Sequence, residues 1–371
     1  MNRKPLSNLA KIISGGTPKR SIHEYWNGSI PWISVKDLHQ GKHIYKTERF
    51  ITESGLKNSS TNLLIQDDIV ISARGTVGLV SMITEPMAFN QSIFGLRSGE
   101  EITAEYLYYW LKLNVSYIQN NVHGSVFDTI TRDTFDIIEV TYPSLEEQKK
   151  VTEILRLLDE KIEQNHQIND NLLDLSMTHF ERWLETTSST NNVSLDEIAT
   201  YKNGLAMQKF EPENDADSLP VLKIRELNQG FTDSSSNRAR TDIDKSVKVY
   251  DGDVIFSWSG TLLVDIWTGG PAGLNQHLFK VTSDAYPKWF YYMWTRYHLR
   301  QFQQIAAGKA TTMGHIKRGD LKAADVIIPT DSEFVQLETL LKPVVDAYIE
   351  NGVEIKSLQT IRDQLLQKLL G

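Results

Sequence analysis

The chain contains no cysteine among its 371 residues. That absence excludes disulfides, thiolate metal ligands and cysteine nucleophiles, and it is typical of proteins in a reducing cytoplasm. No apolar run reaches the roughly eighteen residues that a membrane-spanning helix needs, and the start Met1–Pro5 leads into no apolar stretch like that of a signal peptide. We therefore expect a cytoplasmic globular protein, not associated with a membrane, with room for two domains of ordinary size.

Motifs for catalysis are also missing. An adenine methyltransferase needs a glycine-rich cofactor turn and an Asn/Asp-Pro-Pro-aromatic loop for the flipped base, and neither occurs. Gly308-Lys309 lacks the upstream glycine and the following Ser/Thr of a phosphate-binding loop, and no two histidines have helical zinc-ligand spacing. Glu354-x-Lys356 matches part of a nuclease motif but lies within a predicted helix. We expect no catalytic residue, no metal site and no cofactor in this chain.

Basic charge is scarce in two short segments. The net charge is −8, yet residues 1–143 hold 14 Lys+Arg and 14 Asp+Glu, and residues 186–329 hold 16 of each. Residues 144–185 hold 5 basic and 10 acidic side chains, and residues 330–371 hold 4 and 7. The acidity is therefore a weak argument against DNA binding, provided that these two segments do not face the DNA.

The second half of the chain repeats the first at a shift of about 185 to 189 residues. Four pairs of segments match in the same order, which indicates an internal duplication. The pairs are Ser29–Gly41 with Ser218–Gly230, Asp68–Thr76 with Asp253–Thr261, Asn90-Gln91 with Asn275-Gln276, and Leu107–Trp110 with Phe290–Met293.

Each repeat ends in a predicted long helix. Capping boxes, Ser144-x-x-Glu147 and Thr330-x-x-Glu333, follow Pro143 and Pro329. Behind each box an apolar seam advances by alternating steps of four and three, the spacing of a coiled coil. Asn165 and Asn351 occupy the same seam position, where a buried polar residue sets the register of a helix pair; two exposed asparagines are the alternative. Pro343 is expected to interrupt and kink the second helix.

The duplication predicts an α+β architecture. Residues 1–143 and 186–329 form two mixed α/β domains related by a pseudo-two-fold axis, and residues 144–185 and 330–371 form two spacer helices. The helices of about forty residues are expected to pair in antiparallel fashion as a coiled coil between the two domains.

The order of several short motifs resembles the specificity subunits of Type I restriction-modification enzymes over nearly the whole chain. The motifs are Ser14–Pro18, Ile30–Ser34 with Asp37-Leu38, Ser72–Gly78, Asn90-Gln91, Gly124 before Ile130, and Pro143–Gln148. The second half departs from them in places: Asn203-Gly204-Leu205 replaces the Gly-Gly-Thr-Pro turn, Ser259 replaces Arg74, and Phe334 replaces Gln148.

The resemblance implies a DNA-recognition subunit that is not itself an enzyme. Each globular domain would be a target-recognition domain for one half of an asymmetric, bipartite site on double-stranded DNA. The helices would fix the gap between the half-sites and dock two methyltransferase subunits, and motor-nuclease subunits can join. S-adenosylmethionine, and ATP with Mg²⁺ where nuclease subunits are present, would be bound by those partners.

Candidate DNA contacts are polar and basic residues beside predicted turns. Arg74 stands where a loop can direct a guanidinium at guanine or at phosphate, with pairing to Asp67 or Asp68 as the alternative. For Lys36 and Arg225, ion pairs with the adjacent Asp37 and Glu226 compete equally. The other candidates are Thr17, Lys19, Arg20, Thr76, His123, Ser125, Arg132, Gln208, Lys209, Lys223, Trp258, Ser259, Lys309, Thr311, Thr312, Lys317 and Arg318.

Two further sets carry weaker expectations. Asn90-Gln91 and Asn275-Gln276 have the amides that recognise adenine, but because both repeats share them we expect them to hold a turn. The aromatic runs Tyr106–Trp110 and Trp289–Trp294 are expected to be helix core, whereas Trp258 is expected at a loop tip where it can touch a base.

Two rival classes of function remain open at this level. In the first, the chain is itself a DNA-cleaving enzyme with a degenerate active site; loss of all cleavage on removal of the partner subunits would dismiss this class. A protein-binding scaffold would bind DNA with a shallow salt dependence and no sequence preference.

Overall fold

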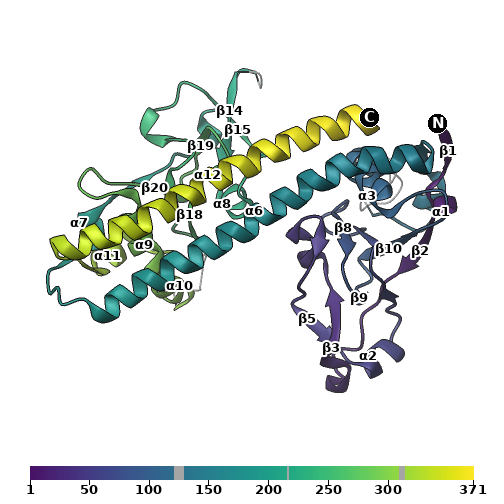
Figure 1. The fold of residues 1–371 in the computed structure, drawn as a ribbon, viewed down its shortest axis with the longest axis horizontal. Coiled ribbons are helices and arrows are strands. Elements are labelled where there is room, and N and C mark those ends of the chain that lie inside the picture. Colours follow the sequence, from purple (N-terminus) through teal and green to yellow (C-terminus); the bar gives the residue numbers. More distant parts are fainter. Residues whose placement is uncertain (121–128, 215–216, 309–313) are drawn as a thin grey trace. The chain divides into compact units, whose positions relative to one another are not determined.

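The computed structural model describes residues 1–120, 129–214, 217–308 and 314–371. The chain divides into two compact units, one made of Met1–Glu160 with Thr360–Gly371 and the other of Lys161–Gln359. Each unit contains one of the two sequence repeats together with part of each long helix (Figure 1). The expected mixed α/β class is confirmed.

The first domain is built from eleven strands and five short α-helices in the described part of the chain. The strands are β1 (Asn2–Pro5), β2 (Ala10–Ser14), β3 (Trp26–Ile33), β4 (His43–Ile44), β5 (Arg49–Ile51), β6 (Leu63–Leu64), β7 (Ile69–Ser72), β8 (Val80–Ile83), β9 (Met87–Phe89), β10 (Ile93–Ser98) and β11 (Glu139–Tyr142). The helices are α1 (Leu6–Leu9), α2 (Glu53–Lys57), α3 (Ala104–Leu113), α4 (Val115–Asn120) and α5 (Thr134–Ile137).

The second domain has matching elements. The strands are β12 (Asn192–Ser194), β13 (Thr200–Asn203), β14 (Ser218–Leu222), β15 (Arg238–Arg240), β16 (Lys248–Val249), β17 (Val254–Ser257), β18 (Val264–Ile266), β19 (Ala272–Leu274), β20 (Leu278–Thr282) and β21 (Asp325–Ile327). The helices are α7 (Leu195–Ile198), α8 (Ile224–Gln229), α9 (Lys288–Tyr297), α10 (Leu299–Gly308) and α11 (Arg318–Lys322).

The sheet topology repeats between the two domains. The order β2-β10-β7-β8-β4 in the first domain corresponds to β13-β20-β17-β18 in the second, and β5-β3-β9-β6 corresponds to β15-β14-β19-β16. Each domain also has a two-stranded ribbon, β1-β11 and β12-β21. The sequence duplication is therefore a duplication of fold.

Apolar runs form the core of each domain. Strands β7 and β17 are buried at every residue, as expected for short apolar runs in the middle of a sheet. The aromatic runs on α3 and α9 are buried against these sheets. The prediction that these tyrosines and tryptophans are core residues is confirmed.

The two long helices are α6 (Leu145–Thr186) and α12 (Asp331–Leu370). Both predicted capping boxes are present: Ser144 N donates to Glu147 at 3.1 Å and Thr330 N donates to Glu333 at 2.8 Å. The expected interruption at Pro343 is wrong, because α12 continues through this residue. A proline removes one helical hydrogen bond, and the residues near it, Leu341 and Val345, are buried in the core of the second unit.

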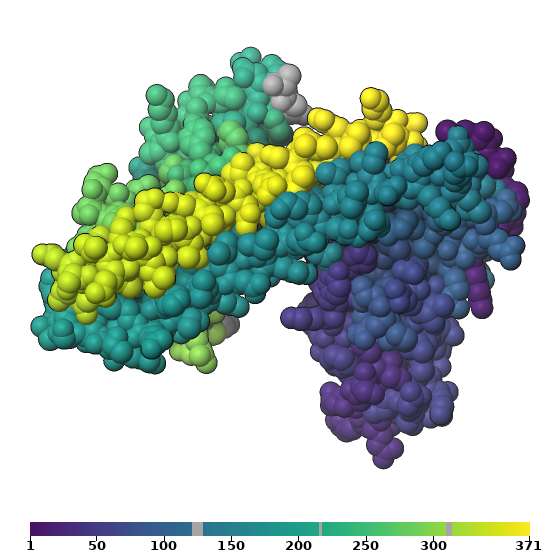
Figure 2. All heavy atoms as spheres, in the orientation of Figure 1, coloured from purple at the N-terminus to yellow at the C-terminus, as the bar shows by residue number. Residues whose placement is uncertain are grey.

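Helices α6 and α12 contact each other in both units, and the contacts of the second unit show that they pair antiparallel there. In the second unit Asn165 bonds Glu354 and Asn169 bonds the Tyr348 carbonyl, and in the first unit Arg362 pairs with Asp159. The α12 partner moves back along its helix as the α6 residue moves forward. The teal surface of α6 and the yellow surface of α12 adjoin in Figure 2.

The start of each long helix is fastened to its domain by different chemistry. Gln148 is fully buried, accepts a hydrogen bond from Thr103 N at 2.8 Å and donates to the Glu101 and Pro143 carbonyls. At the matched position in the second unit, Phe334 packs against Trp289 and Phe290. The departure from the motif noted in the sequence therefore exchanges a buried polar anchor for an aromatic one.

None of the helices within the described ranges is both long and apolar enough to cross a membrane.

The second domain approaches α12 closely at Gly352. A Cβ atom there would lie 2.5 Å from Thr268 Oγ1 and 2.9 Å from Thr268 Cβ. We expect Gly352→Ala to lower the free energy of unfolding by about 1–3 kcal/mol, the usual cost of overpacking, although alanine is the better helix former. Gly319→Ala is the control, because that helical glycine has open space around it. Urea unfolding of both variants checks this, and a Gly352→Ala chain as stable as the Gly319→Ala chain would contradict it.

Candidate nucleic-acid interface

One edge of the main sheet in the first domain collects several loops. Strands β2 and β7 flank β10 and are antiparallel to it, with Ser14 opposite Phe94 and Ser72 opposite Ile93. The loops that follow β2 and β7 therefore share an edge with the turn before β10. Strand β3 ends beside that turn, since Asn90 N donates to the Ile33 carbonyl at 3.0 Å.

We call these segments the first loop edge: residues 15–20, 34–36, 73–79, 90–92 and 129–132. Residues 129–132 are included in the first loop edge because Ile130 N donates to the Ala73 carbonyl at 3.1 Å. The second loop edge follows from the same topology around β13, β17 and β20: residues 204–209, 223–225, 258–263, 275–277 and 315–318.

The predicted DNA contacts that the structure describes all lie on these two loop edges. In the first domain they are Thr17, Lys19, Arg20, Lys36, Arg74, Thr76 and Arg132. In the second they are Gln208, Lys209, Lys223, Arg225, Trp258, Ser259, Lys317 and Arg318. His123, Ser125, Lys309, Thr311 and Thr312 lie outside the described residues.

The same scaffold supports both loop edges. Ser72 Oγ donates to the Thr76 carbonyl, and Ser257 Oγ donates to the Thr261 carbonyl at 2.8 Å. Gly15 and Gly204 allow the first loop to cross the turn before β10 and β20: a Cβ would lie 2.0 Å from Asn90 O at Gly15 and 2.2 Å from Leu274 O at Gly204. The two domains thus present side chains from equivalent backbone positions.

Arg74 is one of several exposed basic residues of the first loop edge, like Lys19 and Arg20. It is exposed, and no hydrogen bond or ion pair joins its side chain to another residue in the described ranges. Asp68, one of the two partners considered from the sequence, is buried and instead receives two bonds from Arg97 at 2.7 and 2.8 Å. The guanidinium of Arg74 is therefore available for a ligand.

Arg132 and Arg318 have a structural task that the sequence did not predict. Arg132 donates to the Ile12 carbonyl on β2 at 2.7 Å, and Arg318 donates to the Tyr201 carbonyl on β13 at 3.1 Å. Arg318 also bonds Asn203 and lies over the Phe279 ring, 5.5 Å from its centroid. Both arginines brace the first strand of their sheet at equivalent places, which argues against their use as DNA contacts.

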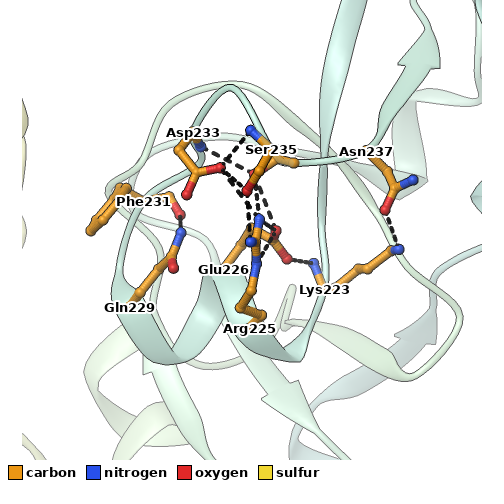
Figure 3. Close-up of polar contacts among 9 residues, drawn as sticks. Lys223, Arg225, Glu226, Gln229, Phe231, Asp233, Ser235 and Asn237 are labelled. Carbon is orange, nitrogen blue, oxygen red and sulfur yellow. Dashed lines mark hydrogen bonds and ion pairs between the residues drawn. The ribbon is translucent and has the colours of Figure 1, made fainter. Parts of the chain in front are cut away.

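Arg225 is exposed, with its side chain 50% accessible, but its guanidinium is held in a polar network of the second domain (Figure 3). Its guanidinium donates to Glu226 at 2.6 and 2.9 Å, to Ser235 at 2.7 Å and to Ser236 at 3.2 Å, and it lies 3.4 Å from Asp233. The hydrogen bond to Glu226 raises the pKa of Arg225. Because Glu226 is buried, the ion-pair alternative is the one that the structure favours here.

Lys223 and Lys36 differ in how firmly their ammonium groups are paired. Lys223 donates to Asn237, as Figure 3 shows, so its ammonium group already has a partner. Lys36 lies 3.9 Å from Glu48 and its side chain is 80% exposed, a weak pair that a phosphate can displace. Asp37, the expected partner of Lys36, instead accepts hydrogen bonds from Ser34 N and Glu48 N.

Trp258 was expected at a loop tip, and that expectation is wrong. Its ring packs against His277 and Phe279, with centroids 5.9 and 5.8 Å away, and its backbone is bonded to residues 277 and 316. Ser259 is buried and bonds His277 Nδ1 at 2.9 Å. Both residues belong to the wall of the second loop edge and not to its outer surface.

The asparagines of the helix seam differ in their burial and in their hydrogen bonds. Asn165 is fully buried and donates to Glu354 at 2.8 Å, and Asn169 donates to the Tyr348 carbonyl at 3.1 Å. Asn351 is only half-buried. The role of Asn165 and Asn351 in setting the register stays a prediction, and Asn169 is a second buried amide on the same helix that can serve it.

A buried charge cluster joins the first domain to both long helices. Asp159 accepts hydrogen bonds from Tyr109 at 2.6 Å and Arg362 at 2.9 Å, and Lys42 lies 4.0 Å away. Burial, reinforced by the charge of Asp159, raises the pKa of Tyr109, which therefore stays protonated as a donor. This cluster could not be predicted from the sequence, because Asp159 looks like any acidic residue on a solvated helix face.

Two copies of one α/β domain, each with a loop edge and each followed by a long helix, define a duplicated modular protein. Residues 1–173 and 188–356 match the family model described as the Type I restriction modification DNA specificity domain. The chain belongs to this family.

Individual relatives match all or part of the chain. The Type I restriction enzyme MjaIX specificity subunit of Methanocaldococcus jannaschii is 27% identical over 399 residues, covering 99% of this chain and 92% of the relative. The HindI specificity subunit of Haemophilus influenzae is 33% identical over 180 residues, covering 46% and 39%. The crystal structure of the Type I S subunit from M. genitalium shares the fold, with a TM-score of 0.52 and 17% identity over 100% of this chain and 96% of that one.

Proposed function

We propose that this chain is the DNA-recognition subunit of a Type I restriction-modification complex and that its two domains each bind one half of a split, asymmetric target on double-stranded DNA. The observation that carries the proposal is the repetition of one loop-edge scaffold with different side chains on it. Arg74 is exposed on the first loop edge, whereas the equivalent Ser259 is buried against His277 on the second. Equivalent surfaces with different donors and acceptors suit two different half-sites.

In this proposal the helices set the gap between the half-sites and dock the catalytic subunits. Two methyltransferase subunits would bind S-adenosylmethionine, and motor-nuclease subunits, where present, would bind ATP and Mg²⁺. Helix α6 supports the docking role, because apolar side chains remain exposed on it: Ile154 at 50%, Leu157 at 53%, Ile168 at 43% and Leu175 at 45%. Ile154, Ile168 and Leu175 are separated by multiples of seven residues, the spacing of a coiled-coil contact.

Ile168→Asp is expected to weaken assembly with the methyltransferase subunit by tenfold or more, because a charge placed in an apolar contact must be desolvated. The change should leave the chain folded, since the side chain is already 43% exposed. Asn171→Asp, at an exposed polar position of the same helix, is the control. Size-exclusion chromatography of the co-expressed subunits measures the effect, and equal assembly of the two variants would remove this surface from the docking role.

Sequence preference itself can be tested with a randomised DNA pool. The assembled complex is expected to enrich a two-part motif with a fixed gap, and the methyltransferase subunits alone are expected to enrich none. Enrichment of the same motif without this chain would reject the proposal.

A further inference from the structure

The paired amides Asn90-Gln91 and Asn275-Gln276 divide into two roles. Asn90 Oδ1 accepts a hydrogen bond from Ser92 N at 2.9 Å, and Asn275 Oδ1 accepts one from His277 N at 3.2 Å. The asparagines therefore hold the turn in both domains, as the sequence predicts for the whole pair. The glutamine side chains take no part in that turn.

The two glutamines are anchored at opposite ends of their amide groups. Thr17 Oγ1 donates to Gln91 Oε1, which leaves the amide nitrogen of Gln91 without a partner among the described residues. Gln276 Nε2 lies 3.3 Å from His277 Nε2, which leaves its Oε1 without one in the same ranges. With Nε2 of His277 accepting, the ring carries its proton on Nδ1 and donates it to Ser259 Oγ at 2.9 Å.

The sequence explains why the anchors differ. Aligning Gly15 with Gly204 places Ala206 opposite Thr17, so the second domain lacks the hydroxyl that holds Gln91. Aligning the two turns places Ser92 opposite His277, so the first domain lacks the imidazole that holds Gln276. One substitution in each domain is enough to reverse which end of the amide is free.

We propose that Gln91 and Gln276 are specificity-determining residues that recognise opposite hydrogen-bonding groups in their two half-sites. Gln91 presents N–H donors and takes a base acceptor in the major groove, such as guanine O6, thymine O4 or a purine N7. Gln276 presents Oε1 and takes an exocyclic amino group, adenine N6 or cytosine N4. Thr17 and His277 are positioning residues that act through these amides. The inference rests on the proposed DNA-recognition function.

A glutamine that both domains share can still contact different bases in the two half-sites. An identical side chain in the same orientation would offer the same hydrogen-bonding group to both half-sites. A glutamine has both a donor and an acceptor end, however, and its anchor decides which end faces the DNA. A base that leaves the free end of the amide buried and unpaired lowers the affinity by about 5- to 150-fold, the usual penalty for a buried hydrogen-bonding group without its partner.

Matched glutamate substitutions test the inference in the complex assembled with its methyltransferase subunits. Gln91→Glu removes the donors, so it is expected to lower the preference for the mapped target over a non-cognate duplex of equal length by about 10- to 100-fold. Gln276→Glu keeps an outward oxygen, and its second oxygen can accept from His277 once the imidazole carries its proton on Nε2 instead of Nδ1, so its preference is expected to change less than about threefold. Gln91→Met and Gln276→Met, which lack polar groups, are both expected to lose preference.

The ratio of cognate to non-cognate binding cancels the general repulsion between a new carboxylate and phosphates. Equal losses for the two glutamate variants, or methionine variants that keep their preference, would overturn the inference. A wild-type complex without any split motif would instead reject the proposed function, and the inference with it.

Exchanging the residues that anchor the two glutamines tests their positioning role. A purely structural role of these residues would leave the methylated motif unchanged. Thr17→Ala with Ser92→His gives Gln91 the anchor that Gln276 has, and it is expected to change the methylated motif at one base of one half-site. The reciprocal pair, Ala206→Thr with His277→Ser, is expected to change one base of the other half. Exchanged variants that methylate the unchanged wild-type motif would contradict the positioning role of Thr17 and His277.

Discussion

Replacing Asp159 with alanine is expected to lower the free energy of unfolding by about 3–5 kcal/mol, the usual result of removing one partner from a buried ion pair. The side chains of Lys42 and Arg362 are only 6% and 14% exposed, so both positive charges would lose their buried carboxylate. Tyr109 would also lose the acceptor of its hydroxyl group. Urea unfolding of the purified chain, followed by circular dichroism, measures the change.

Asp363 provides a matched control for this effect. It contacts the same Arg362 at 2.8 Å, but its side chain is 61% exposed. Asp363→Ala is therefore expected to cost less than about 1 kcal/mol, as for other solvated ion pairs. Equal costs for Asp159→Ala and Asp363→Ala would show that burial of the cluster does not stabilise the first domain.

Arg74→Ala is expected to weaken binding of the assembled complex to its target about 10- to 100-fold, without an effect on assembly. The substitution removes an exposed guanidinium, whose two N–H donors match guanine O6 and N7 or a phosphate. Fluorescence anisotropy on target and non-target duplexes at one salt concentration separates these cases. Loss on the target alone indicates a base contact, and equal loss on both duplexes indicates a phosphate contact.

Arg3→Ala is the control for Arg74. Arg3 is also exposed and lies in the same unit, but it pairs with Glu139 on the β1-β11 ribbon, away from the loop edge. Its removal is expected to leave the affinity within about twofold of wild type, as for a charge far from the contact surface. Unchanged affinity of the Arg74→Ala complex would remove Arg74 from the DNA interface.

The duplication and the long helices could be predicted because their signals are local or periodic. The capping boxes at Ser144 and Thr330 involve residues three apart, and both form as expected. The seam repeats every seven residues, and Leu155, Ile162 and Asn165 are buried as its spacing requires. Matched segments in the same order gave the two domains and their shared loop positions.

The roles of individual basic residues could not be predicted, because they depend on contacts between residues far apart in the chain. Arg132 and Arg318 look like free cations, yet they bond carbonyl groups 120 and 117 residues away. Trp258 follows a strand and resembles a loop-tip residue, but the later segment around residue 316 folds over it. A turn motif therefore predicts where the recognition surface lies and not which side chains on it are available.

We propose that this chain supplies the sequence specificity of a DNA methyltransferase complex. The most direct test places its gene with that of the partner methyltransferase subunit in a host without DNA methylation and maps methyladenine across the genome by long-read sequencing, with and without this chain. We expect a split, asymmetric methylated motif with a fixed gap that appears only when the chain is present. An unmethylated genome in the presence of the assembled complex, or the same motif in the absence of this chain, would contradict it.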